Sequence, residues 1–135
     1  PFYSGIMGMM ATTGLMKVIT DWIISISTPE TLGFFAFLSG GLVNMFIPSG
    51  GGQWAVQGPI MIEAALSLDV NPSVVVLGVA YGDQWSNMIQ PFWTIPILAI
   101  AGLHMRQILG YTFVIFIITG FLYGGGMLHM GTGNI

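Results

Sequence analysis

Residues 31–47 read TLGFFAFLSGGLVNMFI, and residues 48–54, which follow them, read PSGGGQW. The first segment carries no charge and, as a helix, would be about 26 Å long at roughly 1.5 Å per residue. Pro48 lacks an N–H and clashes with the preceding turn, so the helix cannot continue through it in the ordinary way. An apolar pattern resumes near Gln53 and runs to Leu68. We therefore predict two apolar helices joined by a glycine-rich turn.

The whole chain is depleted in charge. Of its 135 residues, 5% are charged and 54% are hydrophobic, and the mean hydropathy is +0.84. Soluble domains carry about 25% charged residues, and a soluble fold would need a charged exterior that this chain cannot supply. Residues 31–62, 84–105 and 107–135 contain no Asp, Glu, Lys or Arg, and about 20 mainly apolar residues suffice to span a bilayer. Composition predicts an all-α membrane protein.

Several function classes are disfavoured. A net charge of −3 without a basic cluster gives no reason to expect a nucleic-acid partner, and the absence of cysteine excludes disulfides and cysteine-based metal sites. His104 and His129 lie outside the polar segments, and no Ser/His/Asp or metal-ligating pattern is present. We therefore expect neither an enzyme nor a bound cofactor. Because the sequence starts at Pro1 inside an apolar segment, we also expect a further N-terminal part.

The segments outside these two predicted helices also have the composition of membrane helices. We predict the end of a transmembrane helix over residues 1–16, an interfacial helix over residues 17–28 and a last transmembrane helix over residues 107–125. Trp22 is expected at headgroup depth, where tryptophan is enriched. Lys17 and Asp21 are spaced to pair across one turn of the interfacial helix.

A second interruption follows the first. Residues 73–81 are apolar but, as a helix, would be only about 14 Å long, which is half of a roughly 30 Å hydrocarbon core. Residues 82–90 are polar, and Pro91 suits the first position of another helix. Irregular backbone at that depth is tolerated where protein buries it or water lines it. Secondary transporters bind solute and ion at such broken helices.

The two interruptions differ in the chemistry that they predict. Three consecutive glycines at 50–52 permit positive φ and leave N–H groups unshielded, and a helix N-terminus follows, so this turn would suit a carboxylate. A plain surface turn between two spans is the alternative. At the second interruption, free carbonyls and Asp83 would suit a cation. The alternative role for Asp83 is a helix cap or a partner for a buried Lys or Arg elsewhere.

Both interruptions contain the pattern G-x-Q-W. It occurs as GGQW at residues 51–54 and as GDQW at residues 82–85. A four-letter match is weak by itself, but both copies fall where a helix is predicted to break. We expect Trp54 and Trp85 to lie too deep to be ordinary interfacial tryptophans.

Two stretches resemble the short-chain fatty acid transporter family, which takes up acetoacetate and butyrate-like acids in bacteria. They are PSGGGQWAVQGP at residues 48–59 and YGDQWSNMIQPFW at residues 81–93, and similarity at residues 1–10 extends the match over the whole chain, as the C-terminal half of such a protein. The family looks like a member of the ion transporter superfamily. The resemblance therefore implies one of two inverted repeats, with a re-entrant helical hairpin over residues 31–68 and a broken transmembrane helix over residues 73–103.

The resemblance also implies a function. It is secondary active transport of short-chain carboxylates across the bacterial cytoplasmic (inner) membrane, by alternating access, in a multi-pass protein. The partners implied are the lipid bilayer, the N-terminal half of the same transporter and a second copy in a homodimer. Substrate would be bound by residues of both interruptions: Ser49, Gly50, Gly51, Gly52, Gln53, Gln84, Ser86 and Asn87.

The coupling ion would lie at Asn44, Ser49, Asp83 and Asn87. The superfamily often has Ser-Asn-Thr loops at these positions, whereas here Ser86-Asn87 is followed by Met88. This departure leaves sodium and proton coupling both open, with no other metal expected. A channel-like or structural membrane module is the alternative function.

Overall fold

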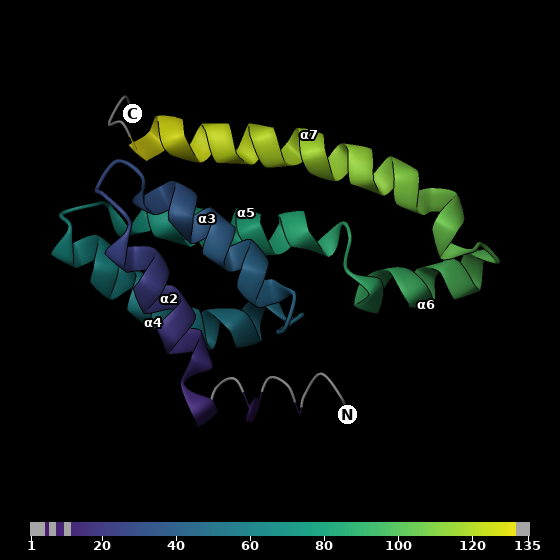
Figure 1. Ribbon diagram of the computed structural model, residues 1–135, viewed down its shortest axis with the longest axis horizontal. Coiled ribbons are helices and arrows are strands. Elements are labelled where there is room, and N and C mark those ends of the chain that lie inside the picture. Colours follow the sequence, from purple (N-terminus) through teal and green to yellow (C-terminus); the bar gives the residue numbers. More distant parts are fainter. Residues whose placement is uncertain (1–4, 6–7, 10–11, 132–135) are drawn as a thin grey trace.

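The computed structural model describes residues 5, 8–9 and 12–131 of the chain. No strand occurs among these residues. Figure 1 shows α3 in the middle of the arrangement, beside α5 and below α7, while α6 turns away from the other helices. The helices are α2 (Leu15–Ser25), α3 (Leu32–Asn44), α4 (Gly50–Ser67), α5 (Pro72–Asn87), α6 (Pro91–Ala101) and α7 (Met105–Gly131).

The predicted hairpin arms appear as α3 and α4, with different bounds at the turn. α3 ends at Asn44, and a short turn leads to Ser49. Ser49 is extended, with φ −154° and ψ 102°, and its hydroxyl accepts a hydrogen bond from the N–H of Gly52. This is the geometry of an N-cap residue. The helix therefore begins at Gly50, earlier than the predicted start near Gln53.

The glycines at 50–52 do not adopt the positive φ that their lack of a side chain permits. All three lie in the first turn of α4. Within the described part of the chain, the residues with positive φ are Gly14, Asp69 and Gly102. The unshielded N–H groups at this turn therefore come from an ordinary capped helix start.

The predicted position of the second interruption also needs correction. The sequence indicated a helix ending at Tyr81, whereas α5 continues through Asn87, and the interruption is confined to residues 88–90. α6 then begins at Pro91 as predicted. Gly82 explains the difference, because it is buried and a Cβ there would meet the Phe37 carbonyl oxygen and the Gly41 nitrogen of α3. It is a packing glycine inside a helix.

Small residues bring α3 and α5 into close backbone contact. Gly78 and Gly82 are spaced one turn apart on α5, and a Cβ at Gly78 would lie 2.7 Å from the Gly33 carbonyl oxygen. On α3, a Cβ at Gly40 would lie 2.8 Å from the Val79 carbonyl oxygen. Glycines at such spacing are typical of helix pairs packed inside membranes, where attraction depends on close van der Waals contact.

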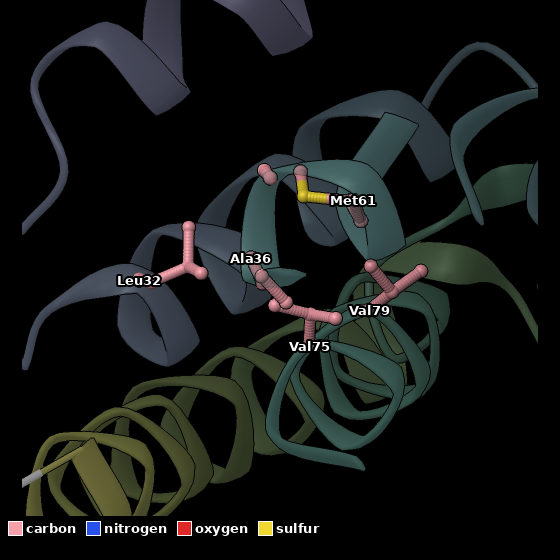
Figure 2. Packing of buried hydrophobic residues seen from close by; sticks show 7 residues of the cluster. Leu32, Ala36, Met61, Val75 and Val79 are labelled. Carbon is pink, nitrogen blue, oxygen red and sulfur yellow. The ribbon is translucent and has the colours of Figure 1, made fainter. Parts of the chain in front are cut away.

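The apolar core lies where the two hairpin arms meet α5. Figure 2 shows Leu32 and Ala36 of α3, Met61 of α4, and Val75 and Val79 of α5 directed toward one another. All five side chains are at most 3% exposed. This cluster fixes the base of the hairpin against α5 and leaves the turn free to meet the other end of that helix.

Trp85 joins α5 to α7. Its Nε1–H donates to the Phe116 carbonyl oxygen at 2.8 Å, and its ring stacks on that of Phe116 with centroids 4.2 Å apart. The ring also lies beside Gly41 of α3 and Gly120 of α7, where a Cβ would approach it to 3.1 Å and 3.0 Å. α3, α5 and α7 therefore pack around one indole ring.

The last helix is longer than predicted. α7 has 27 residues and extends the expected span of residues 107–125 at both ends. Of the described helices it is the one long and apolar enough to cross a membrane, and only 6% of its apolar window is buried. At the other end of the chain, half of residues 1–16, predicted as the end of a transmembrane helix, lie outside the described residues.

α2 covers most of the segment predicted as an interfacial helix over residues 17–28. It begins two residues earlier, at Leu15, and ends at Ser25. The predicted pairing of Lys17 with Asp21 is present, at 3.0 Å between Nζ and Oδ2. Trp22 is 64% exposed, and its expected depth in a membrane stays a prediction.

Candidate functional site

The turn of the α3–α4 hairpin meets the C-terminal end of α5, and Asn44 is the centre of the contact. Its Nδ2 donates to the Asp83 carbonyl oxygen at 3.0 Å, to Ser86 Oγ at 2.8 Å and to Asn87 Oδ1 at 2.8 Å. The Asn44 side chain is fully buried. The two regions singled out in the sequence, about forty residues apart, are therefore joined by one amide group.

The short loop between α5 and α6 is also hydrogen-bonded to Asn44. Gln90 Nε2 donates to the Asn44 carbonyl oxygen at 2.8 Å, and the Gln90 side chain is 1% exposed. Asn87 Nδ2 lies 3.4 Å from Asp83 Oδ2. Gln90 was assigned no role in the sequence analysis, although it is a polar residue immediately before Pro91, where a helix was expected to begin.

Two helix ends of opposite polarity converge here. α4 begins at Gly50, and the N–H groups of a first helical turn have no partner inside the helix. α5 ends at Asn87, where carbonyl groups are free in the same way. A Cβ placed on Gly50 would lie 3.6 Å and 3.7 Å from the two carboxyl oxygens of Asp83. The Asp83 carboxyl group therefore faces the positive end of the α4 dipole.

Four buried oxygen atoms around this contact lack a hydrogen-bond partner among the described residues. An unpaired buried acceptor costs about 1–3 kcal/mol, and native structures contain few of them. All four are acceptors, so each would pair with a hydrogen-bond donor or a cation. They are Asn44 Oδ1, Gln53 Oε1, Asp83 Oδ1 and Gln90 Oε1.

A ladder of buried amides holds the two hairpin arms together beneath the turn. Gln53 Nε2 donates to the Gly40 carbonyl oxygen and to Gln57 Oε1, both at 2.9 Å. Gln57 Nε2 in turn donates to Ser39 Oγ at 2.9 Å. All three polar side chains are fully buried. Sequence reasoning missed Gln57 and Ser39, because their partners lie on the opposite arm and no local pattern indicates them.

A cavity of about 330 Å³ lies between α4 and α5, beside the hairpin turn. Gly50, Gln53 and Asp83 line it together with apolar side chains of both helices. Two of the residues that carry unpaired buried oxygens, Gln53 and Asp83, therefore lie on the cavity wall.

The predicted site residues divide into two groups. Asn44, Asp83, Ser86 and Asn87 are brought together by hydrogen bonds, and Ser49 and Gly50 lie at the turn beside them. Gly52 takes part through its N–H bond to Ser49. Gln84 is exposed on α5, and Gly51 has open space around it. Among the described residues, neither of these two has a contact that joins the hairpin turn to α5.

Comparisons with known proteins identify related sequences. A family model described as "Short chain fatty acid transporter" matches residues 1–130. Two relatives named "Putative short-chain fatty acid transporter" are similar to the chain. The protein of Escherichia coli (strain K12) is 44% identical over 97% of this chain. That of Haemophilus influenzae (strain ATCC 51907 / DSM 11121 / KW20 / Rd) is 40% identical over 96% of it.

The match covers only part of each relative. The chain spans 29% of the length of both. No solved structure matches it at a significant level. The family match and the apolar α7 together indicate a membrane protein. Because the family model matches nearly every residue, this chain belongs to the short-chain fatty acid transporter family.

Proposed function

We propose that the chain is part of a secondary transporter that carries short-chain fatty acids across the bacterial cytoplasmic membrane, coupled to sodium ions or protons. The family assignment favours transport over catalysis. The observation that carries the proposal is the set of unpaired buried oxygens where the hairpin turn meets α5. Native structures contain few such groups, and a bound ion is one of the partners that explain them.

The carboxylate of the substrate is assigned to the start of α4. Gly50 and Gly51 are exposed there, and their N–H groups belong to the first turn of a capped helix. Helix N-termini bind anions through these N–H groups and the positive end of the dipole. The absence of side chains at both positions lets a carboxylate approach the backbone closely.

The same geometry supplies a physical reason for coupling. Asp83 already faces Gly50, so a substrate carboxylate at the α4 start would lie near a second carboxyl group. Two negative charges in a desolvated site repel strongly, and the neighbouring Asn44, Gln53 and Gln90 oxygens are acceptors too. A proton on Asp83 or a bound sodium ion relieves the repulsion, and a sodium ion also takes unpaired oxygens as ligands, so that acid and cation bind together.

In this proposal α3 and α4 form a re-entrant hairpin, and α5 and α6 form a broken transmembrane helix. The hydrogen bonds that join Asn44 to the end of α5 support movement of the hairpin turn and that helix end as one body. The N-terminal half of the same transporter supplies an inverted repeat and the other side of the site. Two such proteins form a homodimer, and alternating access moves the body across the membrane.

The test uses the full-length protein that contains this segment, reconstituted in liposomes. Uptake of labelled butyrate is followed under an imposed sodium gradient and, separately, under a proton gradient. We expect one gradient to drive accumulation, and Asp83→Asn to abolish the gradient-driven part. Accumulation that Asp83→Asn leaves unchanged would remove Asp83 from the coupling site.

Asp69→Asn is the matched control. Asp69 is exposed at the opposite end of α4 and α5, in the loop between them, with φ 55°. Asparagine tolerates this left-handed conformation well, so the substitution changes charge without straining the backbone. Uptake by Asp69→Asn should equal that of the wild type. Passive equilibration of butyrate in the wild type under both gradients would instead favour the channel-like alternative.

A further inference from the structure

The cavity between α4 and α5 has two chemically different ends. Gly50 and Asp83 lie opposite each other at one end, beside the hairpin turn. Trp54 of α4 and Val76 and Ala80 of α5 line the rest. Because α4 starts at the end where α5 finishes, the two helices run antiparallel here, and the walls become apolar with distance from the turn.

The depth of the cavity follows from helix geometry. Asp83, Ala80 and Val76 lie on one face of α5, at spacings of three and four residues. Seven residues separate Asp83 from Val76, which corresponds to about 10 Å along the helix axis. Gln53 reaches the polar end, with its Oε1 unpaired and its side chain fully buried. The cavity volume of 330 Å³ is in the lower part of the range, about 300–1,000 Å³, of small-molecule sites.

Trp54 is held in place from its own helix. A Cβ on Gly58, one turn further along α4, would lie 2.6 Å from the Trp54 indole. The indole therefore lies flat over Gly58 and gives the cavity a broad, rigid apolar wall. Aromatic faces of this kind bury aliphatic chains with little loss of side-chain freedom.

We propose that this cavity holds the aliphatic tail of the transported acid and sets the chain length that the transporter accepts, with Trp54, Val76 and Ala80 as specificity-determining residues. The inference rests on the proposed function and extends it. The family assignment gives only the class of acid, whereas this inference names the residues that contact its aliphatic tail. The carboxylate remains at Gly50 and Gly51, and the tail extends toward Val76.

If the tail occupies this cavity, the depth of the cavity sets the preferred carbon-chain length of the acid. Each buried methylene contributes about fourfold in affinity, from about 0.8 kcal/mol per CH₂. Acids that fill the cavity should bind better with each added carbon, until the tail extends past Val76. Acetate carries only a methyl group beyond its carboxylate and should respond little to changes in the wall.

The experiment measures butyrate, acetate and hexanoate uptake by the full-length protein in liposomes. Ala80→Leu fills the cavity near its middle, and we expect the KM for butyrate to rise about tenfold while that for acetate changes less than about twofold. Val76→Ala lengthens the cavity, and we expect hexanoate uptake relative to butyrate to rise about fourfold. The two variants therefore move the preferred chain length in opposite directions.

Leu77→Ala is the control for Val76→Ala. Leu77 is the next residue of α5 but lines a separate surface hollow near Asp69 and Gly131. It loses more side-chain volume, yet the chain-length ranking should stay that of the wild type. Thermal unfolding of each purified variant checks that it is folded, and Val76→Ala tests the idea even where Ala80→Leu is unstable.

Two results overturn the inference in distinguishable ways. Wild-type uptake with a chain-length ranking unchanged by Val76→Ala, or changed equally by Leu77→Ala, rejects the tail site and leaves the transport proposal standing. Absence of saturable uptake of any of the three acids by the wild type rejects the proposed function and this inference with it.

Discussion

The two copies of the G-x-Q-W pattern lie in opposite settings. GGQW, at residues 51–54, occupies the first turns of α4, where N–H groups are free. GDQW, at residues 82–85, lies in the last turns of α5, where carbonyl groups become free. The first copy therefore presents donors to the site and the second presents acceptors.

This contrast extends to each letter of the pattern. Gly51 has open space around it, whereas Gly82 lies against the backbone of α3. Gln53 is fully buried in the hairpin, whereas Gln84 is exposed. Position relative to a helix end and a neighbouring helix decides the role of a residue, and the residue type alone does not. Paired substitutions at equivalent letters test this statement directly.

The largest difference is expected for the glycines. Gly82→Ala places a methyl group against the backbone of Phe37 and Gly41, and α5 must move away from α3. We expect a loss of about 3 kcal/mol in unfolding free energy, at the upper end of overpacking penalties. Gly51→Ala should leave stability unchanged or raise it by up to about 1 kcal/mol. Thermal unfolding of both purified variants measures the difference, and equal midpoints would refute the close packing.

The glutamines should differ by less. Gln53→Ala removes the donor to the Gly40 carbonyl oxygen and to Gln57 Oε1, and leaves Gln57 Oε1 buried without its donor. This change should cost about 2 kcal/mol of stability. Gln84→Ala removes an exposed side chain and should stay within about 0.5 kcal/mol of the wild type. Denaturant titration in detergent compares the two, and a larger loss for Gln84→Ala would contradict the assignment.

The tryptophans give the smallest difference in stability. Trp85→Phe keeps a stacked ring but loses the bond from Nε1–H to the Phe116 carbonyl oxygen, for about 1 kcal/mol. Trp54→Phe keeps an aromatic wall without removing a hydrogen bond that joins helices, so its unfolding midpoint should match that of the wild type. Its effect should appear in the chain-length preference for acids. If Trp85→Phe alone changed that preference, the assignment of the tail site to Trp54 would be contradicted.

Much of the arrangement was predictable from local chemistry and from the family resemblance. The charge-free segments, Pro48 and Pro91 gave helices α3 to α6 in the correct order, and the pairing of the hairpin turn with the end of α5 was expected. Asn44, Asp83, Ser86 and Asn87 were named as site residues and lie in contact. Their roles in binding acid and ion remain proposals.

What could not be predicted depends on partners distant in the sequence. Gly82 looks like a turn residue until α3 is placed against it, and this is why α5 was expected to end too early. Gln57 and Gln90 find their partners 18 and 46 residues away, in Ser39 and Asn44. No periodicity within one helix reveals such bonds, so the amide ladder and the unpaired acceptors emerged only from the packed structure.

The buried amide ladder of the hairpin has a consequence for how the protein is made. α3 has 13 residues, fewer than the roughly 20 that a helix needs to span a bilayer, and α4 carries Gln53 and Gln57 into its buried face. We expect the insertion machinery to accept α7 as a stable anchor by itself, whereas α3 and α4 leave it together, once their amides have paired. A substitution that breaks the ladder should therefore be seen first as newly synthesised protein that is degraded during insertion.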